Sequence, residues 1–247
     1  MSRSLILTHT KYQFIEQIRV PIALVASAFF PAAAMLAFIV PYAGDNPVAA
    51  TMSTGSMMLF AVMSSALMGL GIGVAEDRAQ PWDPYTRTLP AGPLARFAAR
   101  LLTNMTIMLL AIIPVLLIAA FLTAATVTPP RLIAGIGAVL LGSVPFALLG
   151  LFVGYLLPIK AAIPVTQLLF FPIAILGGLL SDPTSPPSFI AAIGPFLPSR
   201  GAVEMVWSVT TGFGTNPVAL IMFVVWTVGA AAAAVWAYRR DEGRRYT

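Results

Sequence analysis

The chain has 247 residues, of which 59% are hydrophobic and 9% are charged, whereas roughly a quarter of the residues of a soluble domain are charged. Nine acidic and fourteen basic side chains are too few to cover a water-exposed surface, so the composition excludes an ordinary soluble domain. The net charge of +5 does not indicate a nucleic-acid partner, because the basic residues stand at the ends of apolar segments.

The chain contains no cysteine and a single histidine, His9, in its polar N-terminal segment. This excludes disulfides, thiolate metal sites and a cysteine nucleophile, and it leaves too few nitrogen ligands for a histidine-based metal or haem site. We therefore predict no metal, no bound cofactor and no catalytic residue on this chain.

The first 19 residues are too polar to cross a bilayer but carry apolar residues at positions 7, 14, 15 and 18. This spacing is typical of a helix that lies in the cytoplasmic interface, with its Lys and Arg side chains reaching the head groups. A disordered tail is the alternative.

Six segments free of Lys, Arg, Asp and Glu are long enough to span a membrane, which takes about 20 mostly apolar residues. The expected helices cover 21–42, 54–75, 101–125, 133–157, 161–180 and 217–238. With the N-terminus in the cytoplasm, twelve of the fourteen Lys and Arg residues lie inside, and only Arg131 and Arg200 lie outside. The positive-inside rule therefore predicts an all-α integral membrane protein with six spans and both termini in the cytoplasm.

Glycine clusters occur in the second and fourth spans. Gly69, Gly71 and Gly73 superficially resemble a nucleotide-binding loop, but no strand precedes them and no Lys-Ser/Thr follows. We interpret them, like the pair Gly150 and Gly154, as small residues that let helices approach closely.

The loop 76–100 after the second span is the most polar stretch of the chain. It begins with Glu76, Asp77 and Arg78, and two acids at a cytoplasmic helix end oppose both the positive-inside trend and the helix dipole. We expect Arg78, Arg87 or a partner protein to compensate them. An ordinary solvated salt bridge is the alternative.

The fifth span combines Pro164, Pro172 and Gln167 with the pair Gly177-Gly178. Each proline frees a backbone carbonyl, so the pattern predicts a broken helix that lines a translocation pathway. Gln167, Pro172, Gly177 and Gly178 are the candidate pathway residues. Alternatively, Gln167 simply forms a hydrogen bond with a neighbouring helix.

The segment 182–204 is the one sizeable outer loop, and it is apolar over 189–197. Such a run is too short to cross the membrane. Two interpretations stay open: a re-entrant hairpin broken at Gly194-Pro195, or a surface helix packed on the bundle.

The spans contain no ionisable residue, and no Walker lysine motif occurs in the chain. Serines in the spans have no histidine or lysine at membrane depth to act as a base. These absences argue against a proton-coupled carrier, ATP hydrolysis by the chain itself and intramembrane proteolysis.

The order of these features resembles the membrane subunits of ATP-binding-cassette transporters of the second exporter type. The resemblance covers essentially the whole chain: an amphipathic N-terminal segment, six spans, and a loop that ends in Arg87-Thr88-Leu89-Pro90. A Pro/Gly-rich fifth span then runs into the outer loop.

The resemblance implies that 1–247 form a single permease domain in the plasma (inner) membrane, with 1–19 as the interfacial helix. By resemblance, the loop 76–100 contains the coupling helix that docks on the ATPase, and the outer loop 182–204 corresponds to a re-entrant pair. The implied coupling residues are Glu76, Asp77, Arg78, Arg87 and Pro90, and the implied outer-loop residues are Gly194, Pro195, Arg200 and Glu204.

The chain lacks a fused nucleotide-binding domain and a large extracellular domain. The resemblance therefore implies separate ABC ATPase subunits, which bind ATP and Mg, and a second permease subunit that forms a homodimer or heterodimer with this one. The absence of intramembrane charge favours an amphipathic or lipid-like substrate that is exported. An uncoupled scaffold or channel, and a lipid-processing membrane enzyme using Asp182, Arg200 and Glu204, are the alternatives.

Overall fold

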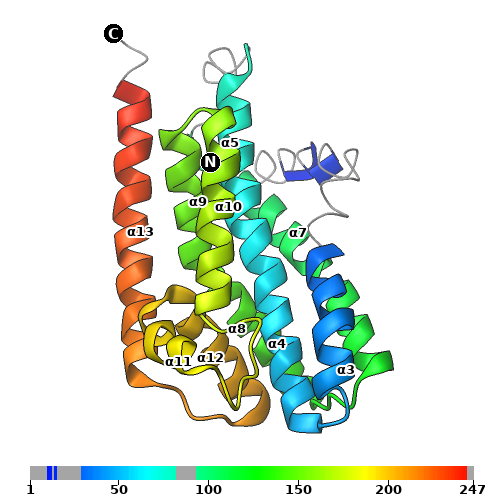
Figure 1. The fold of residues 1–247 in the computed structure, drawn as a ribbon. Coiled ribbons are helices and arrows are strands. Elements are labelled where there is room, and N and C mark those ends of the chain that lie inside the picture. The colour runs from blue at the N-terminus through cyan, green and yellow to red at the C-terminus, as the bar shows by residue number, and fades with distance from the viewer. Residues whose placement is uncertain (1–9, 13, 16–28, 82–92, 244–247) are drawn as a thin grey trace.

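The computed structural model describes residues 10–12, 14–15, 29–81 and 93–243, and all regular secondary structure in that part of the chain is helical (Figure 1). Five described helices are long and apolar enough to cross a membrane: Pro47–Ala79, Arg100–Leu122, Pro129–Leu156, Ile159–Leu176 and Pro217–Asp241. These five correspond to the second through sixth predicted spans. The all-α membrane fold class is confirmed to this extent.

The first predicted span is described only from residue 29, where the apolar helix Phe29–Tyr42 begins. It contains the π-helix η1 (Met35–Ile39) and ends in α3 (Val40–Ala43). Residues 21–28 lie outside the described residues, so the count of six spans stays a prediction.

The N-terminal segment is described at five residues only, and these are helical. Lys11 and Tyr12 are exposed, whereas Phe14 and Ile15 are partly buried, and the Thr103 hydroxyl donates to the carbonyl of Thr10 at 3.4 Å. This piece lies across the direction of the bundle helices in Figure 1, beside the start of α7. An interfacial helix remains our prediction for the whole segment.

The second span is the central helix of the bundle. It consists of α4 (Pro47–Ser64), the π-helix η2 (Ser65–Gly69) and α5 (Leu70–Ala79). Its start is well defined, because the Asn46 side chain accepts hydrogen bonds from the amides of Val48 and Ala49 and Pro47 occupies the first turn. The most apolar stretch is 72% buried, against 22–28% for the third, fifth and sixth spans, so this helix is the most enclosed of the five.

The remaining described helices are α7 (Pro93–Leu122), α8 (Pro129–Gly142), α9 (Val144–Leu156), α10 (Ile159–Leu176), α11 (Ser188–Ile193), the 3-10 helix η3 (Gly194–Phe196), α12 (Pro198–Thr211) and α13 (Pro217–Gly243). The spans among them alternate in direction, with the fourth span made of α8 followed by α9. Figure 1 shows the ends of α5 and α13 at one end of the bundle, which we call the Arg78 end. The opposite end carries α11 and α12 and is called the α12 end.

The prediction of a broken fifth span is wrong, because the break lies in the fourth. α10 is continuous from Ile159 to Leu176 despite Pro164 and Pro172. The fourth span instead divides at Ser143, two residues before Pro145, into α8 and α9. The missing amide hydrogen and the ring of a proline interrupt the helical ladder, and at this point the Ser143 hydroxyl and backbone amide both donate to the Leu140 carbonyl, at 2.6 and 3.2 Å.

The outer loop forms α11, η3 and α12, and α12 extends well past the predicted limit at residue 204. α12 reaches Thr211 and packs against α8, α4 and α13. Its Trp207 is fully buried, and the indole Nε1 donates to the Met52 carbonyl at 2.9 Å and to the Ser56 hydroxyl at 3.2 Å. α12 is therefore a part of the core, whereas the depth at which it enters the membrane stays a prediction.

Glycine contacts seat α9 on the central helix. A Cβ on Gly150 would lie 2.8 Å from the carbonyl oxygens of Ala66 and Leu67, and one on Gly154 would lie 2.8 Å from the Gly71 carbonyl oxygen. The predicted packing role is confirmed for Gly71, Gly150 and Gly154. Among the described residues a Cβ on Gly73 would meet no atom within 4 Å, so a packing role for Gly73 stays a prediction.

The substitution Gly150→Ala tests this contact. The added methyl group would meet two backbone carbonyls, which cannot move as a flexible side chain can, so we expect destabilisation of about 1–3 kcal/mol. Thermal unfolding of the detergent-purified chain should show a Tm lowered by several degrees. Gly73→Ala is the matched control and should leave the Tm unchanged or slightly raised, since the substitution only improves helix propensity. Equal effects of the two substitutions would contradict this packing.

Candidate functional site

At the Arg78 end, one arginine joins three helices. Arg78, in the last turn of α5, donates from Nη1 to the carbonyls of Gly154 at 2.8 Å and Leu157 at 3.2 Å. These carbonyls belong to the C-terminal turn of α9, where no further helical amide is available to them. Nε and Nη2 donate to the Asp241 carboxylate of α13 at 3.0 and 2.5 Å.

This cluster, which we call the Arg78 clamp, is largely removed from water. The side chain of Arg78 is 20% exposed and that of Asp241 is 5% exposed. A guanidinium group suits the position, because its planar fork supplies donors in several fixed directions at once. The clamp therefore fixes the end of α5, from which the loop 76–100 starts, to α9 and α13.

A second ion pair closes the base of the same loop. Asp77 Oδ2 pairs with Arg100 Nη2, which ties the end of α5 to α7. The pair is partly exposed, so we assign it under about 1 kcal/mol. Among the described residues Glu76 has no ion-pair partner and is exposed, while Arg87 and Pro90 lie outside the described residues.

Arg78 was one of the groups expected to compensate the neighbouring acids Glu76 and Asp77, and the structure shows a different pairing. Asp77 pairs with Arg100, and Arg78 turns away from its acidic neighbours towards Asp241. Asp241 was not among the predicted site residues. The signal in the sequence is an acid directly after Arg239 and Arg240 in the final helix, which interrupts an otherwise basic helix end.

At the α12 end, Arg200 and Glu204 form a buried ion pair. They stand one helical turn apart in α12, and Arg200 Nε donates to Glu204 Oε1 at 2.6 Å. Glu204 Oε2 accepts the backbone amide of Asn216 at 2.6 Å, just before α13 begins. The Arg200 guanidinium lies over the Trp207 ring, 5.1 Å from its centre. Glu204 therefore fastens α12 to the start of α13.

The end of α10 packs against this cluster. A Cβ on Gly177 would collide with the Ser199 hydroxyl, which donates to the Ile173 carbonyl at 2.6 Å. Gly178 has a φ of +84°, a conformation that favours glycine. A Cβ on Gly178 would lie 3.2 Å from Arg200 Nη1. Gly194 is also buried, and a Cβ there would lie 3.2 Å from the Leu176 carbonyl oxygen.

The predicted residues therefore divide into two groups. Gly177, Gly178, Gly194, Arg200 and Glu204 come together around the start of α12, and Pro195 of η3 is partly buried beside them. Gln167 and Pro172 lie apart from them on the exposed face of α10.

The exposed face of α10 is apolar except for Lys160 in its first turn and Gln167. Leu168 is 71% exposed and Phe171 43% exposed. Among the described residues the Gln167 amide makes no hydrogen bond, although it lies at the middle of the helix. An unpaired amide at membrane depth is unfavourable, so this face is suited to contact another polar surface.

Asp182 begins the outer loop with a local turn. Its Oδ1 accepts the Thr184 hydroxyl at 2.7 Å and the Thr184 amide at 2.8 Å. The hydrogen bond from the Thr184 side chain lowers the pKa of this carboxyl, with the backbone amide adding to the effect. Asp182 is a turn residue, and the described contacts do not bring it to Arg200 or Glu204 as a lipid-processing site would require.

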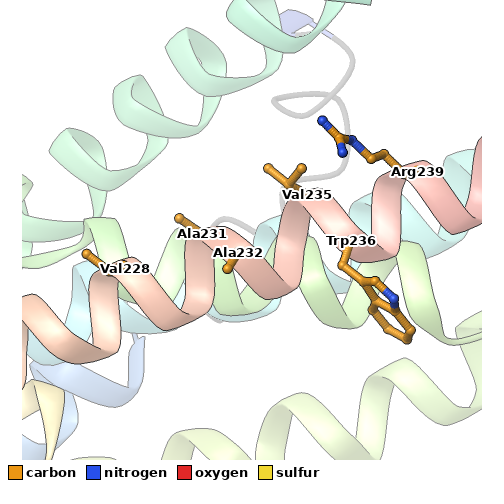
Figure 2. A pocket seen from close by; sticks show the side chains of 6 residues that line it. All are labelled: Val228, Ala231, Ala232, Val235, Trp236 and Arg239. Carbon is orange, nitrogen blue, oxygen red and sulfur yellow. The ribbon is translucent and has the colours of Figure 1, made fainter.

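A shallow groove of about 550 Å³ follows α13, and its described lining residues all belong to that helix. Figure 2 shows Arg239 and Trp236 diverging from its end, with Val235, Ala232, Ala231 and Val228 along it. A groove formed by one apolar helix is typical of a lipid-facing surface. Among the described residues no group of three or more His, Cys, Asp or Glu side chains is arranged to hold a metal ion.

The long apolar helices and lipid-suited surface define a multi-pass α-helical membrane protein with polar clusters at the two ends of its bundle. Comparison with protein families shows that residues 4–211 match the family described as ABC-2 type transporter, so the chain belongs to that family. It is similar to "Putative transport permease YvfS" of Bacillus subtilis (strain 168), with 27% identity over 158 residues. That match covers 64% of this chain and 64% of the relative, just under two thirds of its length.

The Arg78→Met substitution tests the Arg78 clamp. It keeps an apolar stem but removes every donor, so the last carbonyls of α9 and the Asp241 carboxylate lose a partner, at an expected cost of about 1–3 kcal/mol. Hydrogen exchange of amides in 238–241 should accelerate by roughly tenfold or more, because that end of α13 is released. Arg78→Lys keeps the charge but not the fork and should give an intermediate rate. Unchanged exchange in Arg78→Met would refute the role of the clamp.

Proposed function

We propose that this chain is the permease subunit of an ATP-driven exporter that works with a separate ATPase. The observation that carries the proposal is the family membership together with the Arg78 clamp, which links a polar loop directly to two membrane helices. ATP and Mg would bind the partner ATPase, since the chain itself carries no Walker lysine motif. We place both termini in the cytoplasm and the protein in the plasma membrane, on the distribution of Lys and Arg.

The coupling surface in this proposal is the Arg78 end. Glu76 is exposed and without an ion-pair partner among the described residues, so its carboxylate is available to an ATPase. Arg78 then transmits a displacement of the loop to α9 and α13, because its donors hold both helices. Asp77, Arg87 and Pro90 complete the proposed coupling set.

The proposed substrate is amphipathic or lipid-like. The described spans carry no Lys, Arg, Asp or Glu between their ends, so an ion or a strongly hydrated sugar would find no charged partner along them. Gln167 and Pro172 line the proposed pathway, which would run along the exposed face of α10, and the buried Gly177-Gly178 turn ends that helix at the α12 end.

A second permease subunit would cover that face of α10. Burial against a second copy would provide the Gln167 amide with a polar partner and would cover Leu168 and Phe171. We therefore propose a dimer in which the two α10 helices lie close to the pathway, formed by two copies of this chain or by this chain and a related one.

A charge reversal tests the coupling surface. Glu76→Lys should reduce the amount of ATPase that co-purifies with the permease by about fivefold or more, because it replaces the carboxylate that contacts the ATPase in this proposal with a cation. Asp45→Lys is the matched control, since Asp45 is an exposed acid at the α12 end, and it should leave co-purification unchanged. If Glu76→Lys has no effect, the scaffold or channel hypothesis gains support instead.

Single-cysteine cross-linking tests the dimer. The chain has no native cysteine, so Gln167→Cys introduces one reactive thiol, and oxidation in membranes should yield a covalent dimer. Val228→Cys on α13 is the control, because Val228 is 64% exposed but lies on a face outside the proposed interface. Cross-linking at 228 without cross-linking at 167 would assign the interface to α13.

A further inference from the structure

A cavity of about 330 Å³ lies near the α12 end, between α4, α7, α8 and α12. This is within the range of about 300–1,000 Å³ that is usual for ligand sites. Its described lining includes Thr54 and Met58 of α4, Leu116 and Ala120 of α7, Leu132 of α8 and Val206 of α12. It lies on a different side of the central helix from the exposed face of α10, because α10 contributes no described lining residue.

The cavity opens sideways. α7 and α8 both pack on α4 but scarcely touch each other, so a gap between them reaches the cavity. The floor is closed, with Met58 4% and Val206 0% exposed, whereas Leu117 at the rim is 52% exposed. Since α7 and α8 belong to helices suited to span a bilayer, the opening faces hydrocarbon.

The cavity has no free hydrogen-bond donor to offer among its described threonines. The hydroxyls of Thr51, Thr54 and Thr210 each donate at 2.7 Å to the backbone carbonyl four residues earlier in their own helix. The other described lining side chains are apolar. A polar ligand or a water molecule would lose hydrogen bonds on entering, whereas a hydrocarbon chain would lose none.

We propose that this cavity binds one acyl chain of a bilayer phospholipid, which enters between α7 and α8. Arg131 stands beside the opening, next to Leu132, and its Nη1 lies 3.5 Å from the Thr210 carbonyl on α12. The exposed guanidinium is placed to contact the lipid phosphate. The bound lipid then contacts α7, α8 and α12 together. The proposal is independent of the proposed transport function.

Trp207 provides a built-in reporter. The indole is fully buried, and its Cδ1 lies 3.7 Å from the point that a Cβ on Gly55 of the cavity wall would occupy. A quencher in bulk lipid is therefore screened by helices, whereas a quencher on a chain inside the cavity is not. With the other three tryptophans changed to phenylalanine, Trp207 fluorescence reports only on this site.

The experiment reconstitutes this full-length single-tryptophan protein in phosphatidylcholine vesicles that contain phosphatidylcholine with a dibrominated acyl chain. We expect strong quenching of Trp207. Ala120→Phe, which fills the opening, should reduce the quenching at least twofold, whereas Ala134→Phe on the exposed surface of α8 outside the cavity should not. Absence of quenching, or equal quenching in both variants, would overturn the proposal.

Two further measurements complete the test. Arg131→Gln should raise the brominated-lipid fraction needed for half-maximal quenching about twofold, and an unchanged fraction would overturn the assignment of the phosphate contact. If the tryptophan substitutions prevent folding, native mass spectrometry of the otherwise unaltered chain replaces fluorescence. The unaltered chain should then retain one bound phosphatidylcholine molecule under activation, whereas Ala120→Phe should lose it. Equal retention by the two proteins would overturn the proposed site.

Discussion

The fold depends on a constraint that the bilayer imposes: apolar helices gain little by exchanging lipid contacts for contacts with one another, so close backbone approach and internal hydrogen bonds must hold them together. The Gly71, Gly150 and Gly154 contacts meet this requirement, because they bring α9 onto the backbone of the central helix. Trp207 does the same for α12 through its bond to the Met52 carbonyl. The apolar side chains then fill the space that these contacts define.

The described ion pairs stand at the two ends of the bundle, and each cluster connects different helices. Arg78 joins α5, α9 and α13 at one end, while Glu204 joins α12 to α13 at the other. α13 takes part in both clusters. A movement of the loop base at the Arg78 end would therefore reach the α12 end through a helix that is held at both ends, which suits a protein driven by an external motor.

The sequence predicted the positions of the membrane-spanning helices well, but it did not predict where a helix breaks or which residue pairs with Arg78. Charge-free runs located the second to sixth spans, because the cost of charge in hydrocarbon makes that signal strong. The sequence pattern placed the helix break in the wrong span. α10 continues through Pro172, whereas the fourth span breaks before Pro145, and the packing of neighbouring helices determines whether a helix continues through its proline. The partner of Arg78, 163 residues away, likewise depends on the tertiary contact of α5 with α13.

The orientation of the Arg78 end and its contact with an ATPase form the central claim, and accessibility of single cysteines tests both. The chain has no native cysteine, so Ala79→Cys and Thr184→Cys each report on one end of the bundle. With a membrane-impermeant maleimide on intact cells, position 184 should react, whereas position 79 should react only after permeabilisation and should be protected when the ATPase is bound. Reaction of position 79 from outside, or no protection by any ATPase that co-purifies, would contradict the account.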